Sequence, residues 1–305
     1  MSSMRASSAR VLVVNGDDFG LTDGVNRGIV DAHTKGILTS ASVFPNAAAT
    51  EDAFALAARV PTLGIGVHLT LVDGTPVLQA ARLPTLAPGG RFRTTWVEFV
   101  AALFARRIAF EEIERELTAQ VDRVRSAGIQ PTHLDGHKHV HTYPPVFAIV
   151  AAIARRFAIR TVRIPRERPG LRLFMSSMVD SRARRQAIEN AALATWADHD
   201  RRILAREGLP PAPVFSGRVL TGLFTEHSLC RAIGNCGPGI TELMTHPGYV
   251  DAALDDVRTR LRRERATEVA LLTSAAVLDA VRRAGITLRS HGTATHALES
   301  HAHVS

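Results

Sequence analysis

The sequence predicts an α/β fold, a barrel of parallel strands with helices outside it. Short β-rich runs alternate with helix-length periodic segments, a rhythm typical of βα units and a parallel sheet. The chain has 305 residues, of which 46% are apolar, so a single barrel with a sizeable core is the economical organisation. The bias toward Ala, Val, Leu and Ile suits strands that are buried on both faces.

The first elements follow from apolar runs and from the turn residues between them. Residues 11–14 are all apolar and open the first strand, which leads into two acidic residues. Gly and Pro residues at 74–90 mark a long loop, which we expect to be functional or to form a lid. The elements expected in order are a strand at 11–16, a helix near 23–35, a strand at 38–44, a helix near 49–59 and a strand at 64–70.

The second half of the chain continues the same rhythm around one insertion. An amphipathic helix near 110–127 ends at Gly128. Residues 166–238 are rich in Arg, Pro and Ala, and we expect them to form an insertion that is helical near 180–206. The other expected elements are a strand at 129–134, a helix near 144–157, strands at 160–164 and 240–244, a helix near 267–284 and a last strand at 286–289. The expected boundaries are 1–9 for a flexible amino terminus, 10–290 for one barrel domain and 291–305 for a flexible tail.

The charge balance of the chain is basic, with a net charge of +8. Arg supplies 35 of the 37 basic residues, and Lys35 and Lys138 are the only lysines, a pattern that fits a GC-rich coding bias. No aromatic-interleaved basic motif accompanies this charge. We therefore expect a solvated surface and no nucleic-acid partner.

The two cysteines, Cys230 and Cys236, have the spacing of neither a redox CxxC pair nor a zinc ribbon. The apolar run near the amino terminus is short and leads into Asp17 and Asp18, so neither a signal peptide nor a transmembrane helix fits. We expect free thiols and a cytoplasmic protein.

Asp17 and Asp18 are the most informative residues, because a buried strand delivers two adjacent carboxylates to its end. Such strand ends are where α/β enzymes perform chemistry. Adjacent carboxylates repel each other unless a cation or a shared proton relieves the repulsion. Metal ligation is therefore the first hypothesis for this pair, and Phe19 beside it is a candidate substrate contact.

Histidines at later strand ends complete a ligand set. His68 lies near the end of the strand at 64–70, and residues 131–141 (PTHLDGHKHVH) contain four histidines and one acid. His246 follows the strand at 240–244. Strand ends gather at one face of an α/β barrel, so these side chains are expected to be neighbours. Carboxylate and imidazole together suit a divalent ion with positions left open for water.

The spacing of His137, His139 and His141 does not identify the ligand among them. In an extended backbone alternate side chains share a face, so all three could point the same way. With Asp18 and His68 as two ligands, one more imidazole suffices for a catalytic site. The other two are expected to orient substrate or a ligand.

Four segments together resemble the YdjC/ChbG family of carbohydrate deacetylases, in order from about residue 10 to about 290. Residues 35–42 and 162–167 resemble the hopanoid-biosynthesis-associated branch, HpnK, in particular. The four segments are residues 14–20 (VNGDDFG), 66–69 (GVHL), 132–141 (THLDGHKHVH) and 244–248 (MTHPG).

The resemblance implies a deformed TIM-like (β/α) barrel and a hydrolase with one divalent metal ion, which removes the acetyl group from an N-acetylated amino sugar. An N-acetylglucosaminyl hopanoid glycolipid is a candidate substrate. Magnesium is commonly described for the family, whereas two imidazoles and a carboxylate suit zinc or another transition ion, so both stay open. The implied roles are metal ligation by Asp18, His68 and His137, general base for Asp17 and proton donor for His246. Asp135, His139, His141 and Phe19 are the candidate substrate contacts.

Two other functions stay open. A metal-dependent phosphoesterase commonly holds two ions about 3.5–4 Å apart and would need more bridging carboxylates than Asp17, Asp18 and Asp135 readily supply. A non-catalytic sugar- or lipid-binding protein of an envelope-lipid pathway would hold a closed, structural metal site.

The expected insertion contains an apolar cluster with basic edges, which suits lipid or an apolar aglycone. Packing of this cluster on the barrel is the favoured interpretation, because apolar stripes usually mark core. Peripheral contact with the inner membrane and oligomerisation stay open. The cluster comprises Leu171, Leu173, Phe174, Met175, Met178 and Val179, flanked by Arg168, Arg172 and Arg182.

Overall fold

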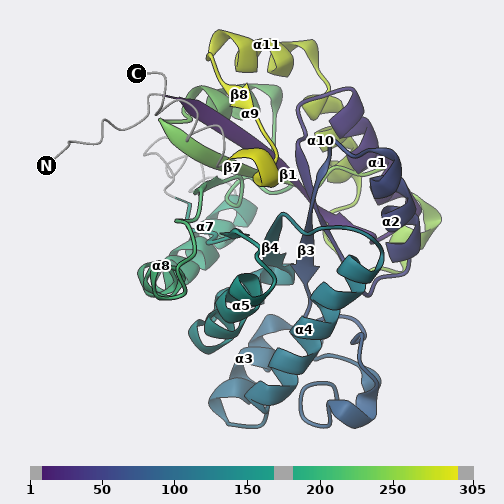
Figure 1. Cartoon of the computed structure of the whole chain (residues 1–305). Helices are drawn as coiled ribbons and strands as arrows, with labels where there is room; N and C mark the ends of the chain where they lie inside the picture. Colours follow the sequence, from purple (N-terminus) through teal and green to yellow (C-terminus); the bar gives the residue numbers. More distant parts are fainter. Residues whose placement is uncertain (1–8, 168–180, 295–305) are drawn as a thin grey trace, which may run out of the picture.

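One parallel sheet, curled into a half-barrel, lies at the centre of the molecule in the computed structural model, which describes residues 9–167 and 181–294 (Figure 1). The strand order is β5-β4-β3-β2-β1-β7-β6; β8 is not part of this order and pairs with β1. The α/β, TIM-like barrel predicted from the sequence is thereby confirmed. The strands are β1 (Arg10–Phe19), β2 (Ser40–Val43), β3 (Gly64–Leu69), β4 (His133–Gly136), β5 (Thr161–Val162), β6 (Val214–Ser216), β7 (Gly239–Thr245) and β8 (Thr287–Leu288).

The central strand β1 has partners on both sides. β7 pairs with it along most of its length on one side. On the other side, β8 pairs with Val11 and Leu12, and β2 pairs with the later part from Asn15 to Phe19. All of these pairings are parallel, so the carboxyl ends of the strands lie at one end of the barrel.

Helices cover the sheet from outside (Figure 1). Their ends follow local capping: the Thr22 side chain accepts a hydrogen bond from the Val25 N–H at the start of α1, and Thr95 and Glu98 form a capping box at the start of α3. None of the helices formed by the described residues is both long and apolar enough to cross a membrane. The helices are α1 (Asp23–Thr34), α2 (Thr50–Arg59), α3 (Trp96–Phe104), α4 (Phe110–Ser126), α5 (Pro144–Arg156), α7 (Ser181–Ala194), α8 (Ala197–Arg206), α9 (Glu226–Gly234), α10 (Arg263–Leu272) and α11 (Ala275–Arg283).

The segment 166–238 is not wholly an insertion, which corrects the sequence-based expectation. β6 lies within it and pairs in parallel with β7, so this part belongs to the barrel sheet, and α9 follows. β6 has only three residues and its first side chain, Val214, is exposed, so no apolar run marks it. The apolar cluster at 171–179 lies outside the described residues.

Three other boundaries differ from expectation. The region between β3 and α4 contains a further helix, α3. The sequence did not predict it, because residues 96–104 are mostly apolar and show no clear polar face. The helix expected near 267–284 is two helices, because Ser274 caps a new start at α11. The strand expected at 129–134 begins later, as β4 at His133.

The first residues of the expected tail are part of the barrel. His291 and Ala294 are buried, and the His291 N–H donates to the Ser40 hydroxyl at 3.0 Å. The His291 ring packs against that of His133 at a tilt of 38°, with centroids 4.1 Å apart. These contacts could not be predicted, because the sequence of the tail is polar and contains Ser and Ala without an apolar pattern. Residues 295–305 lie outside the described part of the chain.

Candidate metal centre

Asp17 and Asp18 lie at the carboxyl end of β1, and both side chains are buried. The pairing of β1 with β2 shifts register between Gly16 and Phe19, and Asp18 has a left-handed backbone with φ of 73°. A bulge of this kind redirects side chains at a strand end. It gives the two adjacent carboxylates different partners.

Asp18, His68 and His137 come together at this end of the barrel. Their candidate ligand atoms all lie within 4.8 Å of one another. Asp18 Oδ1 is 3.6 Å from His68 Nε2 and 3.9 Å from His137 Nδ1. These separations are too long for hydrogen bonds, but they fit donors about 2.0–2.2 Å from a shared ion. The three predicted ligands therefore form a possible metal-binding cluster.

The protonation states of two of these groups favour a cation. Burial would raise the pKa of Asp18, but the positive charge of Arg265 and neighbouring imidazoles outweighs it and lowers the pKa well below its usual range. Burial lowers the pKa of His137 to about 3, so its imidazole is neutral. Phe44 contacts the rings of both His68 and His137 edge-on, which helps to fix their orientation.

The balance of buried charges around this cluster also favours binding of a divalent cation. Four buried carboxylates are linked to only two buried guanidinium groups, so two negative charges stay uncompensated when the histidines are neutral. A bound divalent ion would neutralise them. The carboxylates are those of Asp17, Asp18, Asp135 and Glu242, and the guanidinium groups are those of Arg163 and Arg265.

Asp17 lies beside the cluster but is bound by a partner of its own. Arg163 donates two hydrogen bonds to its carboxylate, at 2.7 and 2.8 Å, and Asn15 donates a third at 2.8 Å. Burial would raise the pKa of Asp17, but Arg163 outweighs it and lowers the pKa to about 2. The carboxylate is therefore charged, oriented and bound to protein.

Asp135, which the sequence predicts as a substrate contact, pairs with the predicted ligand His68 in the interior of the barrel. It is fully buried, its Oδ1 lies 2.9 Å from His68 Nδ1, and the Ser42 hydroxyl donates to its Oδ2 at 2.7 Å. A carboxylate in this position fixes the ring that presents its other nitrogen to a metal. Burial lowers the pKa of His68, but Asp135 and the two aspartates of β1 outweigh this effect and raise it.

His139 and His141 are buried, His139 against the Phe215 ring and His141 with its Nε2 3.1 Å from the Arg163 carbonyl oxygen, and Phe19 is fully buried in the hydrophobic core. The expected extended backbone is absent, because Lys138 and His139 adopt left-handed conformations within a 3-10 segment, His137–Thr142. The alternation of side chains in a strand therefore does not apply. Of these three histidines, His137 is the one that joins Asp18 and His68 in the possible metal-binding cluster of the described residues.

His246 lies after β7 and within electrostatic reach of Asp17 and Asp18, which act on its pKa. Burial is the larger effect and lowers the pKa of His246 to about 4. Its backbone N–H donates to Glu268 at 2.6 Å, and burial raises the pKa of Glu268 to about 7. The predicted proton donor is thus held at the site, but in its neutral form.

Sequence reasoning missed the two buried arginines. Arg163 follows β5 and contacts Asp17, Asp135 and Glu242, whereas Arg265 in α10 donates to Asp18 at 2.5 Å. With 35 arginines in the chain, residue type alone does not distinguish them.

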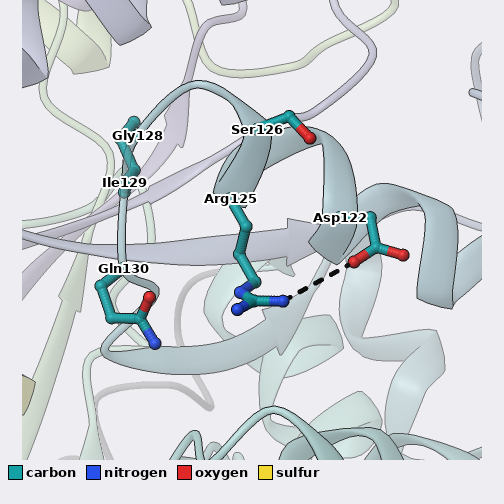
Figure 2. A pocket seen from close by; sticks show the side chains of 6 residues that line it. All are labelled: Asp122, Arg125, Ser126, Gly128, Ile129 and Gln130. Atoms are coloured by element: carbon teal, nitrogen blue, oxygen red, sulfur yellow. Dashed lines mark ion pairs between the residues drawn. The ribbon is translucent and has the colours of Figure 1, made fainter.

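A separate hollow lies at the other end of β4, before the strand begins (Figure 2). Its volume is about 330 Å³, and an ion pair of 3.9 Å between Arg125 and Asp122 lies on its wall. It has no histidine or cysteine ligand. We therefore place the candidate site at the carboxyl ends of the strands. The hollow is lined by Asp122, Arg125, Ser126, Gly128, Ile129 and Gln130.

Known proteins are similar to this chain in sequence over most of their length. A carbohydrate deacetylase from Brevibacillus brevis is 36% identical over 266 residues, which cover 87% of this chain and 91% of that protein. A chitooligosaccharide deacetylase from Klebsiella pneumoniae is 32% identical over 284 residues, covering 92% and 98% of the two chains.

The fold also matches a solved structure. A proposed cellobiose-phosphate cleavage protein from Enterococcus faecalis V583 superposes with a TM-score of 0.74 at 24% identity, covering 94% of this chain and 99% of that one. Residues 11–283 match the family described as YdjC-like protein. The chain therefore belongs to the YdjC-like family.

Proposed function

We propose that this protein is a metal-dependent carbohydrate deacetylase that removes the acetyl group from an N-acetylated amino sugar. The observation that carries the proposal is the different pairing of two adjacent carboxylates at the end of β1: Asp18 joins His68 and His137, while Arg163 binds both carboxylate oxygens of Asp17. The names of the Brevibacillus and Klebsiella relatives support the reaction class.

Asp18, His68 and His137 would hold one divalent ion. When bound, the ion supplies positive charge that polarises the amide carbonyl and makes water more acidic. Two nitrogens and one oxygen favour zinc or another transition ion over magnesium. We propose a transition ion as the physiological metal, with magnesium as the alternative from the family resemblance.

Asp17 would act as the general base. In an amide hydrolysis the attacking water must lose a proton, and a fixed carboxylate oxygen beside the metal ligand Asp18 can accept it. Because Arg163 keeps the pKa of Asp17 at about 2, the carboxylate is deprotonated at neutral pH and can accept a proton. It is a weak base, so the attacking water would have to be made more acidic by the metal ion. Arg163 also stops the carboxylate from turning toward the metal.

His246 would protonate the leaving amine. Since its pKa is about 4, the imidazole is neutral at pH 7 and must gain a proton within each cycle. The proton that Asp17 takes from water is the available source. The net result moves one proton from water to the amine, while the acyl carbon–nitrogen bond breaks and acetate forms.

A two-metal phosphoesterase is less well supported. A second group that could hold a metal, Asp17, His68 and Asp135, shares His68 with the first. Its two carboxylates are already ion-paired with Arg163, at 2.7 and 2.8 Å. A second cation there would lie beside a buried guanidinium group, which like-charge repulsion disfavours.

We also propose that the sugar is carried on a lipid, as in a hopanoid glycolipid, and that the protein contacts the membrane peripherally. Four of the seven large apolar side chains exposed on the described part of the chain lie between residues 96 and 110. The Phe104 side chain, 71% exposed, contacts the ring of Tyr143, which directly follows the His137–Thr142 segment. The four exposed side chains, on α3 and at the start of α4, are those of Trp96, Val97, Phe104 and Phe110, and we call this set the α3 face.

The proposal is tested by acetate release from a panel of N-acetylglucosamine conjugates, including a hopanoid glycoside, with the metal stripped and restored. We expect release that requires the ion, with one ion per chain by elemental analysis. Two ions per chain, together with release of phosphate from a phosphoester panel, would favour the phosphoesterase. Binding without turnover across both panels would favour a sugar-binding protein.

A further inference from the structure

An ion pair lies on the most open side of the candidate metal centre. His137 is 21% exposed at its side chain, whereas those of Asp18 and His68 are 8% and 3% exposed. Lys138, the next residue, places its Nζ 2.6 Å from Asp73 Oδ2, and both side chains are partly exposed. Substrate that approaches the ligands from the His137 side therefore meets this pair first.

The backbone on both sides of this pair is strained. Asp73, Lys138 and His139 have φ of 59°, 52° and 56°, in the left-handed region that side chains disfavour. Such conformations persist where the surroundings enforce them, and they cluster at functional sites. Asp18 at the metal centre shares this feature.

The choice of lysine is also unusual in this chain. Only Lys35 and Lys138 depart from the use of arginine at basic positions. A lysine ammonium is a compact donor with three N–H groups, whereas a guanidinium is a planar fork suited to carboxylate and phosphate. A compact donor beside a carboxylate acceptor suits adjacent hydroxyl groups of a sugar ring.

We propose that Lys138 and Asp73 form the sugar-recognition rim of the site and select an uncharged saccharide over a phosphorylated one; this inference rests on the proposed deacetylation. Lys138 would donate to one hydroxyl and Asp73 would accept from its neighbour. Because the two charges cancel, the rim offers no net attraction to a phosphate. The pair acts on substrate binding and leaves the reacting atoms to the metal centre.

Steady-state kinetics on a disaccharide of N-acetylglucosamine and on its 6-phosphate test the rim. We expect Lys138→Met to raise KM for the uncharged disaccharide about tenfold, as for the loss of one hydrogen bond to a charged group, with kcat changed less than about threefold. Metal content should match that of the wild type. Arg123→Met is the matched control, because Arg123 forms a 2.9 Å ion pair with Glu51 on the surface.

Asp73→Asn supplies the second arm. It leaves the Lys138 charge unbalanced, so we expect the ratio of kcat/KM for the phosphorylated disaccharide to that for the uncharged one to rise about tenfold. An unchanged ratio would overturn the selection of uncharged sugars. Loss of metal or of kcat with an unchanged KM in Lys138→Met would show that the pair only braces His137, and would also overturn the proposal.

Calorimetric binding of the uncharged disaccharide to the metal-loaded protein separates this inference from the proposed function. Wild-type binding that weakens about tenfold in Lys138→Met, without acetate release by either protein, would refute the deacetylase and support the rim. Acetate release with equal binding by both proteins would support the deacetylase and refute the rim. Wild-type protein that binds neither disaccharide would refute the rim as well.

Discussion

Arg163 and Asp17, which are 146 residues apart in the sequence, form a bidentate ion pair inside the barrel, with N–O distances of 2.7 and 2.8 Å. The same guanidinium lies 2.8 Å from Asp135, which orients the predicted ligand His68. The Arg163 guanidinium thus links Asp17, the proposed general base, to Asp135, which pairs with the predicted ligand His68. Its removal would leave buried carboxylates without compensation.

Arg163→Lys is expected to lower kcat about 100-fold while the protein still folds. A lysine keeps the charge but cannot donate two parallel hydrogen bonds to Asp17, so the base loses its orientation. Arg163→Met should cost about 3–5 kcal/mol in the free energy of unfolding, because it breaks a buried ion-pair network. Kinetics and denaturant unfolding measure the two effects. Full activity in Arg163→Lys would show that the orientation of Asp17 is unimportant.

The variants Asp17→Asn and Asp18→Asn should distinguish the proposed role of Asp17 as general base from that of Asp18 as metal ligand. Asp17→Asn is expected to reduce kcat by at least about 100-fold with nearly intact metal occupancy, because general-base catalysis is lost. Asp18→Asn should lose the metal, since the amide is a poorer ligand than a carboxylate. Elemental analysis after dialysis measures occupancy. If Asp17→Asn also loses the metal, Asp17 is a ligand and the assigned roles are wrong.

Removal of the metal is expected to abolish acetate release and to lower Tm. The chelated protein loses stabilisation of about 2.7 kcal/mol relative to protein with free ion at 100 times its Kd. Differential scanning calorimetry with zinc, cobalt and magnesium added back ranks the ions. An unchanged Tm upon chelation and add-back would argue against a metal at Asp18, His68 and His137.

Asp200→Asn should stabilise the protein at alkaline pH. Asp200 is buried in α8, and neither carboxylate oxygen has a hydrogen-bond partner among the described residues. Burial raises its pKa to about 8, and Arg201 counteracts this only in part. The folded protein therefore keeps a proton that the unfolded chain releases above about pH 4. The free energy of unfolding should fall from about pH 4 to about pH 8, by up to about 1.4 kcal/mol per pH unit.

The check for Asp200 is a pH series of denaturant unfolding curves. The advantage of Asp200→Asn over the wild type should be near zero at pH 4 and largest at pH 8. An equal advantage at both values would mean that the carboxyl group does not titrate between them.

Replacing Trp96 and Phe104 together by Ser is expected to weaken membrane binding about tenfold or more, because each large apolar side chain contributes about 1.5–3 kcal/mol when buried. Flotation with vesicles of phosphatidylcholine and phosphatidylglycerol measures the bound fraction. Val250→Ser is the control, since Val250 is exposed but lies outside the α3 face. Equal flotation of all three proteins would remove the membrane proposal.

The residues of the possible metal-binding cluster could be predicted because residue type and position along a strand are local properties. Asp18 and His68 follow from apolar runs that end in polar side chains, and parallel strands bring such ends together. The alternation of helix and strand was likewise visible in the hydrophobic pattern. β6 was not, because its three residues gain their strand conformation from pairing with β7.

The partners of these residues could not be predicted. Nothing distinguishes Arg163 or Arg265 from the other arginines until the barrel closes around the carboxylates they pair with. His139 and Phe19 were predicted as substrate contacts, yet both side chains are buried: His139 lies where the backbone at 138–139 is left-handed, and Phe19 lies where the pairing of β1 with β2 shifts register.

The sequence by itself determined the class of fold, the strand ends that meet and the residue types available for a metal, since these depend on hydrophobic periodicity and chain order. Only the tertiary structure decided that Arg163 holds both carboxylate oxygens of Asp17, whereas Arg265 pairs with Oδ2 of Asp18 and leaves its Oδ1 facing His68 and His137. That choice depends on side-chain directions and on charges brought together across more than a hundred residues, and local sequence encodes neither.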